Sequence, residues 1–130
     1  MDIRSRKIEK IVEADDRYKI EAYDFVMETL AFTLRKLEQP RHVSGQELLE
    51  GIREYALEQF GVMTRAVFEH WGIHSSEDFG EIVFNMVVAG LMSKTVKDSK
   101  DDFKNGYDFE EVFGKSAGCD LTDRRPLGKK

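Results

Sequence analysis

The sequence predicts a compact, mainly α-helical single domain of five helices. Apolar residues recur at intervals of three and four over most of the first 90 positions, which is the period of a helix with one buried face. Two Ser-x-x-Glu/Asp patterns and several glycines mark where such helices begin and end. The 130 residues, 41% hydrophobic and 35% charged, suffice for one core and are too few for two.

The first predicted helix is amphipathic and ends near Ala14. Its apolar face consists of Ile8, Ile11 and Val12. After two aspartates a second helix keeps a helical period for about four turns. Its apolar stripe consists of Tyr23, Val26, Met27, Leu30, Ala31, Leu34 and Leu37. Because Phe25 and Phe32 lie off this stripe, we expect the second helix to be buried between neighbours at the centre of the fold.

Pro40 ends the second helix, since it lacks a backbone N–H and disfavours helical geometry in the residue before it. Ser44 and Glu47 then form a capping-box pattern, so a third helix begins at Ser44. Its apolar face consists of Leu48, Leu49, Ile52, Tyr55, Ala56 and Phe60. Gly61 is placed to end it in a left-handed conformation.

Two shorter helices follow. One covers about 62–71, offers Met63, Ala66, Val67 and Trp71 to the core, and ends at Gly72. Ser75 with Asp78 begins the other, and Gly90 is its expected end. The inner side of this last clear helix consists of Phe79, Ile82, Val83, Met86 and Val87.

Two structures fit residues 91–113. The alternation of Tyr107, Phe109 and Phe113 suits a strand, which would make a small C-terminal β-hairpin with 91–96 and a winged-helix-like arrangement. Alternatively, Asp108 caps a short helix. We expect residues 1–114 to form the helical domain and 115–130, which have no apolar period, to form a flexible basic tail.

The composition also limits which cellular compartment and which kinds of chemistry fit this chain. A single cysteine cannot form an internal disulfide, the first ten residues are too charged for a signal peptide, and the longest apolar stretch, 82–92, is too short to span a bilayer. We therefore expect a cytoplasmic protein with no membrane association. His70 and His74 have zinc-like spacing, but Gly72 lies between them and no further ligand follows a zinc pattern.

Other chemical motifs are incomplete. The acidic run 98–108 places Phe103 and Val112 where a calcium loop needs oxygen ligands. The Gly-Lys-Ser run at 114–116 lacks the earlier glycine of a phosphate loop, and Cys119 has no base beside it in the sequence. We expect no cofactor, no metal and no enzymatic activity.

Charge argues against nucleic-acid binding by the folded part. The formal net charge is -5, and residues 115–130 carry five Lys or Arg and two Asp, a net +3 that leaves -8 for residues 1–114. The recognition helix of a winged-helix arrangement would expose Glu77, Asp78, Glu81 and Asn85, and the three carboxylates of this surface repel phosphate. The alternative polyanion site is the basic tail, namely Lys115, Arg124, Arg125, Lys129 and Lys130.

Three runs resemble a small bacterial family that is described as restricted to planctomycete and verrucomicrobial lineages. They are PRHVSGQELLEGIREYA at 40–56, EHWG at 69–72 and DFGEIVFN at 78–85. The resemblance covers residues 8–113 and implies one compact domain that ends near Phe113. It implies no activity, cofactor or catalytic residue.

The sequence thus favours a non-enzymatic protein-interaction or scaffold module. Its partner is another protein or a second copy of the chain, and the candidate contact residues Tyr18, Phe25 and Phe32 lie beyond the main stripe of the second helix. A further candidate is a small-molecule pocket where Arg41 and His42 meet Trp71. The alternative function is nucleic-acid binding, through the winged-helix-like domain or the basic tail.

Overall fold

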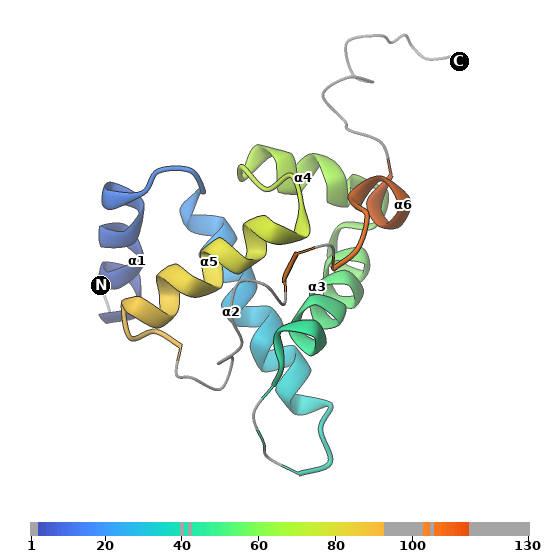
Figure 1. Ribbon diagram of the computed structural model, residues 1–130, viewed down its shortest axis with the longest axis horizontal. Coiled ribbons are helices and arrows are strands. Elements are labelled where there is room, and N and C mark those ends of the chain that lie inside the picture. Colours follow the sequence, from blue (N-terminus) through green and yellow to red (C-terminus); the bar gives the residue numbers. More distant parts are fainter. Residues whose placement is uncertain (1–2, 40, 42, 93–102, 105, 115–130) are drawn as a thin grey trace, which may run out of the picture.

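Helices account for most of the residues that the computed structural model describes, 3–39, 41, 43–92, 103–104 and 106–114 (Figure 1). The helices are α1 (Ile3–Ala14), α2 (Ile20–Arg35), α3 (Gly45–Phe60), α4 (Thr64–His70), α5 (Ser76–Val88) and α6 (Phe109–Phe113), with a 3-10 helix, η1 (Gly61–Met63), before α4. The predicted mainly α fold of five helices is confirmed by α1 to α5, and α6 is a single further turn.

The caps confirm the predicted starts of α3 and α5 and the glycine ends of α3, α4 and α5, whereas α2 ends at Arg35, before the predicted stop at Pro40. The Ser44 hydroxyl accepts a hydrogen bond from the Glu47 N–H at 3.0 Å, and the Glu47 carboxylate accepts one from the Ser44 N–H at 3.0 Å. This reciprocal pair satisfies two N–H groups that the first turn of α3 leaves unpaired. Gly61, Gly72 and Gly90 all have positive φ and follow the ends of α3, α4 and α5.

The central helix is α2, which contacts α1, α3 and α5 as predicted (Figure 1). Its buried face differs from the predicted stripe, because Ala31 and Leu34 are exposed while Thr29 and Thr33 are buried. The reason is a close approach of α2 to Gly51 on α3, where an added Cβ would lie 2.1 Å from Thr33 Oγ1. Only small side chains fit at this crossing.

The phase of α4 also differs from the prediction. Met63, expected to face the core, is 55% exposed, and Phe68, absent from the predicted face, is completely buried. The chain turns through η1 before α4 begins at Thr64, and this 3-10 turn has fewer residues than a turn of α-helix. Thr64 and Phe68, four residues apart, therefore share the buried face.

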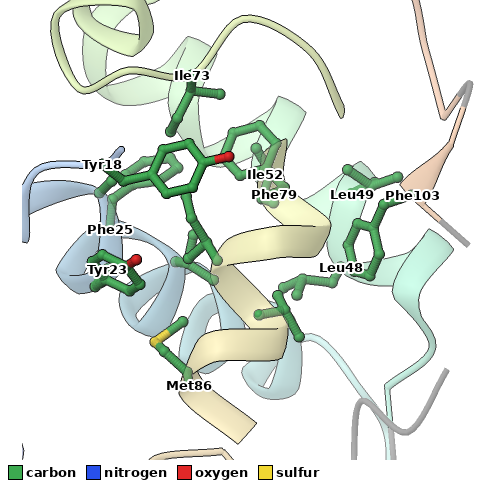
Figure 2. Packing of buried hydrophobic residues seen from close by; sticks show 14 of the residues in the cluster. Tyr18, Tyr23, Phe25, Leu48, Leu49, Ile52, Ile73, Phe79, Met86 and Phe103 are labelled. Carbon is green, nitrogen blue, oxygen red and sulfur yellow. The ribbon is translucent and has the colours of Figure 1, made fainter. Parts of the chain in front are cut away.

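Phe68 lies at the centre of an aromatic core. Its ring packs against the rings of Phe25, Trp71, Phe79, Phe109 and Phe113, with centroid distances from 5.2 to 6.1 Å. Figure 2 shows other buried residues of the same core, with Phe103 and Leu49 at one side of the view and Tyr18 at the other. The core thus joins side chains that are up to 105 positions apart in the sequence, from Ile8 to Phe113.

Of the two structures that fit residues 91–113, the described residues adopt the short helix and not the second strand of the hairpin. Residues 109–113 form α6, and the Asp108 carboxylate caps it by accepting from the N–H groups of Glu110 and Glu111 at 2.9 and 3.3 Å. A helical turn places Phe109 and Phe113 on one face with ring centroids 5.0 Å apart, so both rings reach Phe68, which an extended strand would not allow. No strand occurs in the described residues, and 93–96 lie outside them.

The segment before α6 is fixed to the rest of the fold by specific hydrogen bonds. The Ser76 hydroxyl donates to the Phe103 carbonyl at 2.5 Å and accepts from the Gly106 N–H at 3.1 Å. The Tyr107 hydroxyl donates to the Leu49 carbonyl at 3.0 Å. These bonds seat the described part of residues 103–113 on α3 and α5.

A corner between α1 and α2 docks on α5. The Arg17 guanidinium donates to the Asp15 carboxylate at 2.9 and 2.7 Å and to the Glu81 carboxylate at 3.2 Å. The Asn85 amide donates to Asp15 at 3.2 Å. The hydrogen bonds from Arg17 hold the pKa of Asp15 well below its usual range, so this carboxylate is charged throughout the physiological range.

A tyrosine completes this corner. The Tyr18 hydroxyl donates to the Asp78 carboxylate at 2.5 Å, and the same carboxylate accepts from the N–H groups of His74 and Ser75 at the start of α5. Burial and the adjacent Asp78 raise the pKa of the Tyr18 phenol, so it stays a hydrogen-bond donor.

The corner corrects the sequence prediction for the recognition helix of a winged-helix arrangement. Three polar positions expected to face solvent on α5 are half-buried and bonded to the corner; they are Asp78, Glu81 and Asn85. They stabilise the α1–α2 connection instead of forming an exposed surface. Only Glu77 of the four is exposed.

This corner predicts a pH dependence of stability. Because the pKa of Asp15 is lower in the folded chain than in the unfolded chain, its contribution is present above about pH 4 and is lost as the pH falls below that value. We expect Asp15→Asn to lower the free energy of unfolding by about 1 kcal/mol at pH 7, a difference that shrinks toward pH 2. Urea unfolding at several pH values measures this, with Asp16→Asn, an exposed neighbour, as the control. An equal loss at pH 7 and pH 2.5 would contradict it.

Candidate functional site

A groove of about 470 Å³ runs between α1 and the C-terminal half of α5. Figure 1 shows these two helices meeting near the N-terminus of the chain. The residues that line the groove are Lys7, Lys10, Ile11, Ala14, Asp15, Phe84, Asn85, Val88 and Ala89. Most of its surface comes from apolar side chains, and the volume lies within the usual range for ligand sites.

The apolar floor arises because α5 carries large apolar residues on two sides. Its inner side, with Phe79 and Ile82 among others, is buried in the core. Phe84 and Val88 lie four residues apart on the outer side and are 49% and 71% exposed. Large apolar side chains grouped on a surface are typical of a site that another molecule covers.

The rim of the groove is basic. Lys7 and Lys10 come from successive turns of α1, and neither makes a salt bridge within the described residues. Asp15 lies at the end of the groove, but Arg17 pairs with its charge at 2.7 Å. As far as the described residues show, the groove therefore combines apolar contact area with two ammonium groups that have no ionic partner, in a chain whose net charge is -5.

The predicted contact surface on the second helix is not formed. Tyr18 and Phe25 are only 2% and 4% exposed, so burial in the core is the correct interpretation for both. Phe32 is half-buried; its ring packs on Tyr55 at a centroid distance of 4.9 Å and lies beneath the Lys36 ammonium. The extra aromatic residues of α2 thus serve packing between helices.

The predicted pocket of Arg41, His42 and Trp71 is wrong for its two described members. The Arg41 guanidinium donates to Glu47 at 3.0 and 2.7 Å before α3, and this pairing holds the pKa of Glu47 at about 2. Trp71 packs on Phe60, the last residue of α3. Glu47 and Phe60 are 13 residues apart in α3, a separation of about 20 Å along the helix axis, so Arg41 and Trp71 lie at distinct sites. His42 lies outside the described residues.

The basic tail stays a prediction. Residues 115–130, with Lys115, Arg124, Arg125, Lys129 and Lys130, lie outside the described part of the chain.

The groove was not predicted from the sequence, although the sequence contains a pattern that indicates it. Phe84 and Val88 are apolar residues that lie opposite the inner stripe of α5. Phe25 and Phe32 on α2 lie off the main stripe of their helix in the same way. The sequence does not show whether the second apolar face of α2 or that of α5 is buried by a neighbouring helix. That depends on the position of α1, which leaves the outer side of α5 open.

The described residues show neither a metal cluster nor a membrane-spanning helix. No group of three or more His, Cys, Asp or Glu side chains is arranged there to hold a metal ion. His70 ends α4 and His74 lies in the turn before α5. None of the described helices has the length and hydropathy needed to cross a membrane.

Comparisons with family models, with curated proteins and with solved structures each found no match to this chain. The resemblance carried by 40–56, 69–72 and 78–85 therefore stays a prediction.

Proposed function

We propose that this protein is a non-enzymatic protein-interaction module that binds an amphipathic helix of a partner protein, rich in acidic side chains, in the groove between α1 and α5. The observation that carries the proposal is the exposed pair Phe84 and Val88 beside the ammonium groups of Lys7 and Lys10, which form no salt bridge with any described residue. Apolar anchors with charged neighbours are the usual way in which a helix is held in a groove.

The dimensions of the groove favour a helix as its occupant. Its α1 wall extends from Lys7 to Ala14, a distance of about 10 Å along the helix axis, or two helical turns. A partner helix could place apolar residues at positions i, i+4 and i+7 over this length, between Ile11 on one side and Val88 on the other.

Charge selects the class of partner. Acidic side chains that flank the apolar face of the partner helix would pair with Lys7 and Lys10 on the rim. A second copy of this chain is less suitable, because two chains with a net charge of -5 repel each other at low ionic strength. We therefore favour a different, acidic protein over a homodimer.

Two designed helical peptides test the proposal. Both carry leucine at positions i, i+4 and i+7, and they differ only in having glutamate or lysine beside these leucines. Measured by fluorescence anisotropy with the full chain, the acidic peptide should bind at least about tenfold more tightly than the basic one. The double substitution Lys7→Glu with Lys10→Glu should reverse this preference.

Substitutions in the apolar floor give the matched control. Val88→Asp should abolish binding of the acidic peptide, whereas Val62→Asp, at a position that is 96% exposed in η1 and outside the groove, should leave it unchanged. Equal binding of both peptides, or equal effects of the two aspartates, overturns the proposal. A dimer detected by light scattering at tens of micromolar and abolished by Val88→Asp would instead identify a second copy as the occupant.

A further inference from the structure

A second hollow, of about 330 Å³, lies where α2 meets the C-terminal ends of α3 and α4. Its lining consists of Glu21, Asp24, Phe25, Glu28, Tyr55, Gln59, Phe60 and Trp71. Half of these residues are aromatic and three are acidic, and no basic side chain is among them. Its volume is at the low end of ligand sites, which suits a small ligand or a single head group.

Aromatic rings form the inner walls of this aromatic cleft. Phe25 is 4% exposed and lies 5.8 Å from Phe60 and 5.5 Å from Trp71 between ring centroids. The ring centroids of Phe60 and Trp71 are 5.8 Å apart and the ring planes lie at 81°, so the two rings form adjacent, nearly perpendicular walls. Tyr55, 5.7 Å from Phe25, extends the wall along α3. Tyr55, Phe60 and Trp71 are half-buried, which leaves part of each ring accessible.

Carboxylates form the outer edge. Glu21, Asp24 and Glu28 are spaced by three and four residues, which places them along one side of α2 next to Phe25. Asp24 pairs with Arg4 at 3.6 Å, and Glu28 accepts a hydrogen bond from the Tyr55 hydroxyl at 3.5 Å. Within the described residues the Glu21 carboxylate makes neither a salt bridge nor a hydrogen bond, so the edge keeps a negative charge.

We infer that the aromatic cleft binds an organic cation, specifically a methylated ammonium group. The electron-rich faces of Trp, Tyr and Phe attract cations, and the carboxylates of α2 add a longer-range attraction. A metal ion is excluded as the occupant, because the described side chains hold no group of three ligands that could converge on one. An unmethylated ammonium is strongly hydrated and loses more on entering an aromatic site than a methylated one does.

Trp71 makes a direct test possible because it is the single tryptophan of the chain, so the intrinsic fluorescence reports on the cleft itself. The full chain is titrated at constant ionic strength with choline and with 3,3-dimethylbutan-1-ol, which has the same shape and no charge. We expect a saturable change with choline and binding at least about tenfold weaker for the neutral alcohol. Equal responses to the two compounds overturn the inference.

Variants locate the site. Glu21→Gln should weaken choline binding by about two- to fivefold. Glu77→Gln removes the same charge from an exposed position at the start of α5, outside the cleft, and should not change choline binding. Phe60→Leu should weaken it further, with circular dichroism as the check on folding. Equal effects of the two glutamine variants overturn the inference. Val88→Asp should leave choline binding unchanged, so failure here and failure of the α1/α5 groove are separate results.

A peptide arm distinguishes the two sources of a methylated ammonium. Choline represents a free small molecule, and a short peptide with one trimethyllysine represents a modified protein. Tighter binding of the trimethyllysine peptide than of choline assigns the cleft to a protein side chain, and tighter binding of choline assigns it to a free cation. A peptide with unmodified lysine should bind more weakly than the trimethyllysine peptide; equal or tighter binding of it contradicts the methylated class.

Discussion

Replacing Phe68 by alanine should lower the free energy of unfolding by about 4 kcal/mol. Phe68 is completely buried, and its ring contacts rings from α2, α5 and α6 as well as Trp71 at the end of α4. Removing the ring leaves a cavity that the four surrounding elements cannot fill by moving together. The variant therefore loses the transfer free energy of the ring and also has the free-energy cost of the cavity. Since domains of this size have about 5–15 kcal/mol of total stability, about a quarter or more of it depends on this side chain.

Urea unfolding followed by circular dichroism measures this loss. Phe84→Ala is the matched control, because the same side chain is removed from a position that is 49% exposed, and we expect it to cost less than about 1 kcal/mol. Phe68→Leu keeps most of the volume and should cost less than about 2 kcal/mol. If Phe68→Ala and Phe84→Ala had the same effect, the central position of Phe68 would be wrong.

Replacing Gly72 by alanine should cost about 3 kcal/mol, for two independent reasons. Gly72 has a φ of +93°, which a residue with a Cβ adopts only with strain. The added Cβ would also lie 2.2 Å from the carbonyl oxygen of Arg17, and a backbone atom in a packed corner cannot rotate away. The corner is held there by the Lys19 N–H, which donates to the Trp71 carbonyl at 3.1 Å.

Gly114 separates the two terms. Its φ of +92° matches that of Gly72, but an added Cβ would meet no atom within 4 Å. Gly114→Ala should therefore show only the conformational strain, about 1 kcal/mol, and the difference between the two variants measures the clash with Arg17. Thermal unfolding of both variants gives the comparison. Equal melting temperatures would mean that the contact between Gly72 and the corner is absent.

The helix boundaries could be predicted from sequence because caps act locally. Ser44 with Glu47 and Asp78 with the N–H of Ser75 lie within one turn of each other, so the residues that decide the structure are neighbours in the chain. The same holds for the glycine at each helix end, where the requirement for positive φ concerns a single residue.

The buried faces were harder to predict, because they depend on residues far away in the sequence. Hydropathy favours Leu34 for the core of α2, yet the core takes Thr33, since the facing position on α3 is Gly51 and the two helices cross closely there. The order of the helices alone does not give this crossing. In the same way, Phe84 and Val88 stay exposed in a groove because of where α1 packs against α5, and the sequence does not give that position.

The α1–α2 corner has a consequence for how the chain folds. Its hydrogen bonds join residues 60 to 70 positions apart, from Tyr18 to Asp78 and from Asp15 to Asn85. Closing a loop of that length costs about 3.6 kcal/mol of chain entropy, and the contacts that repay this cost form only when α5 is already in place. We therefore expect the corner to form late in folding. Because most other contacts of a helical domain are local, we expect docking of the α1–α2 connection on α5 to be the slowest step of folding.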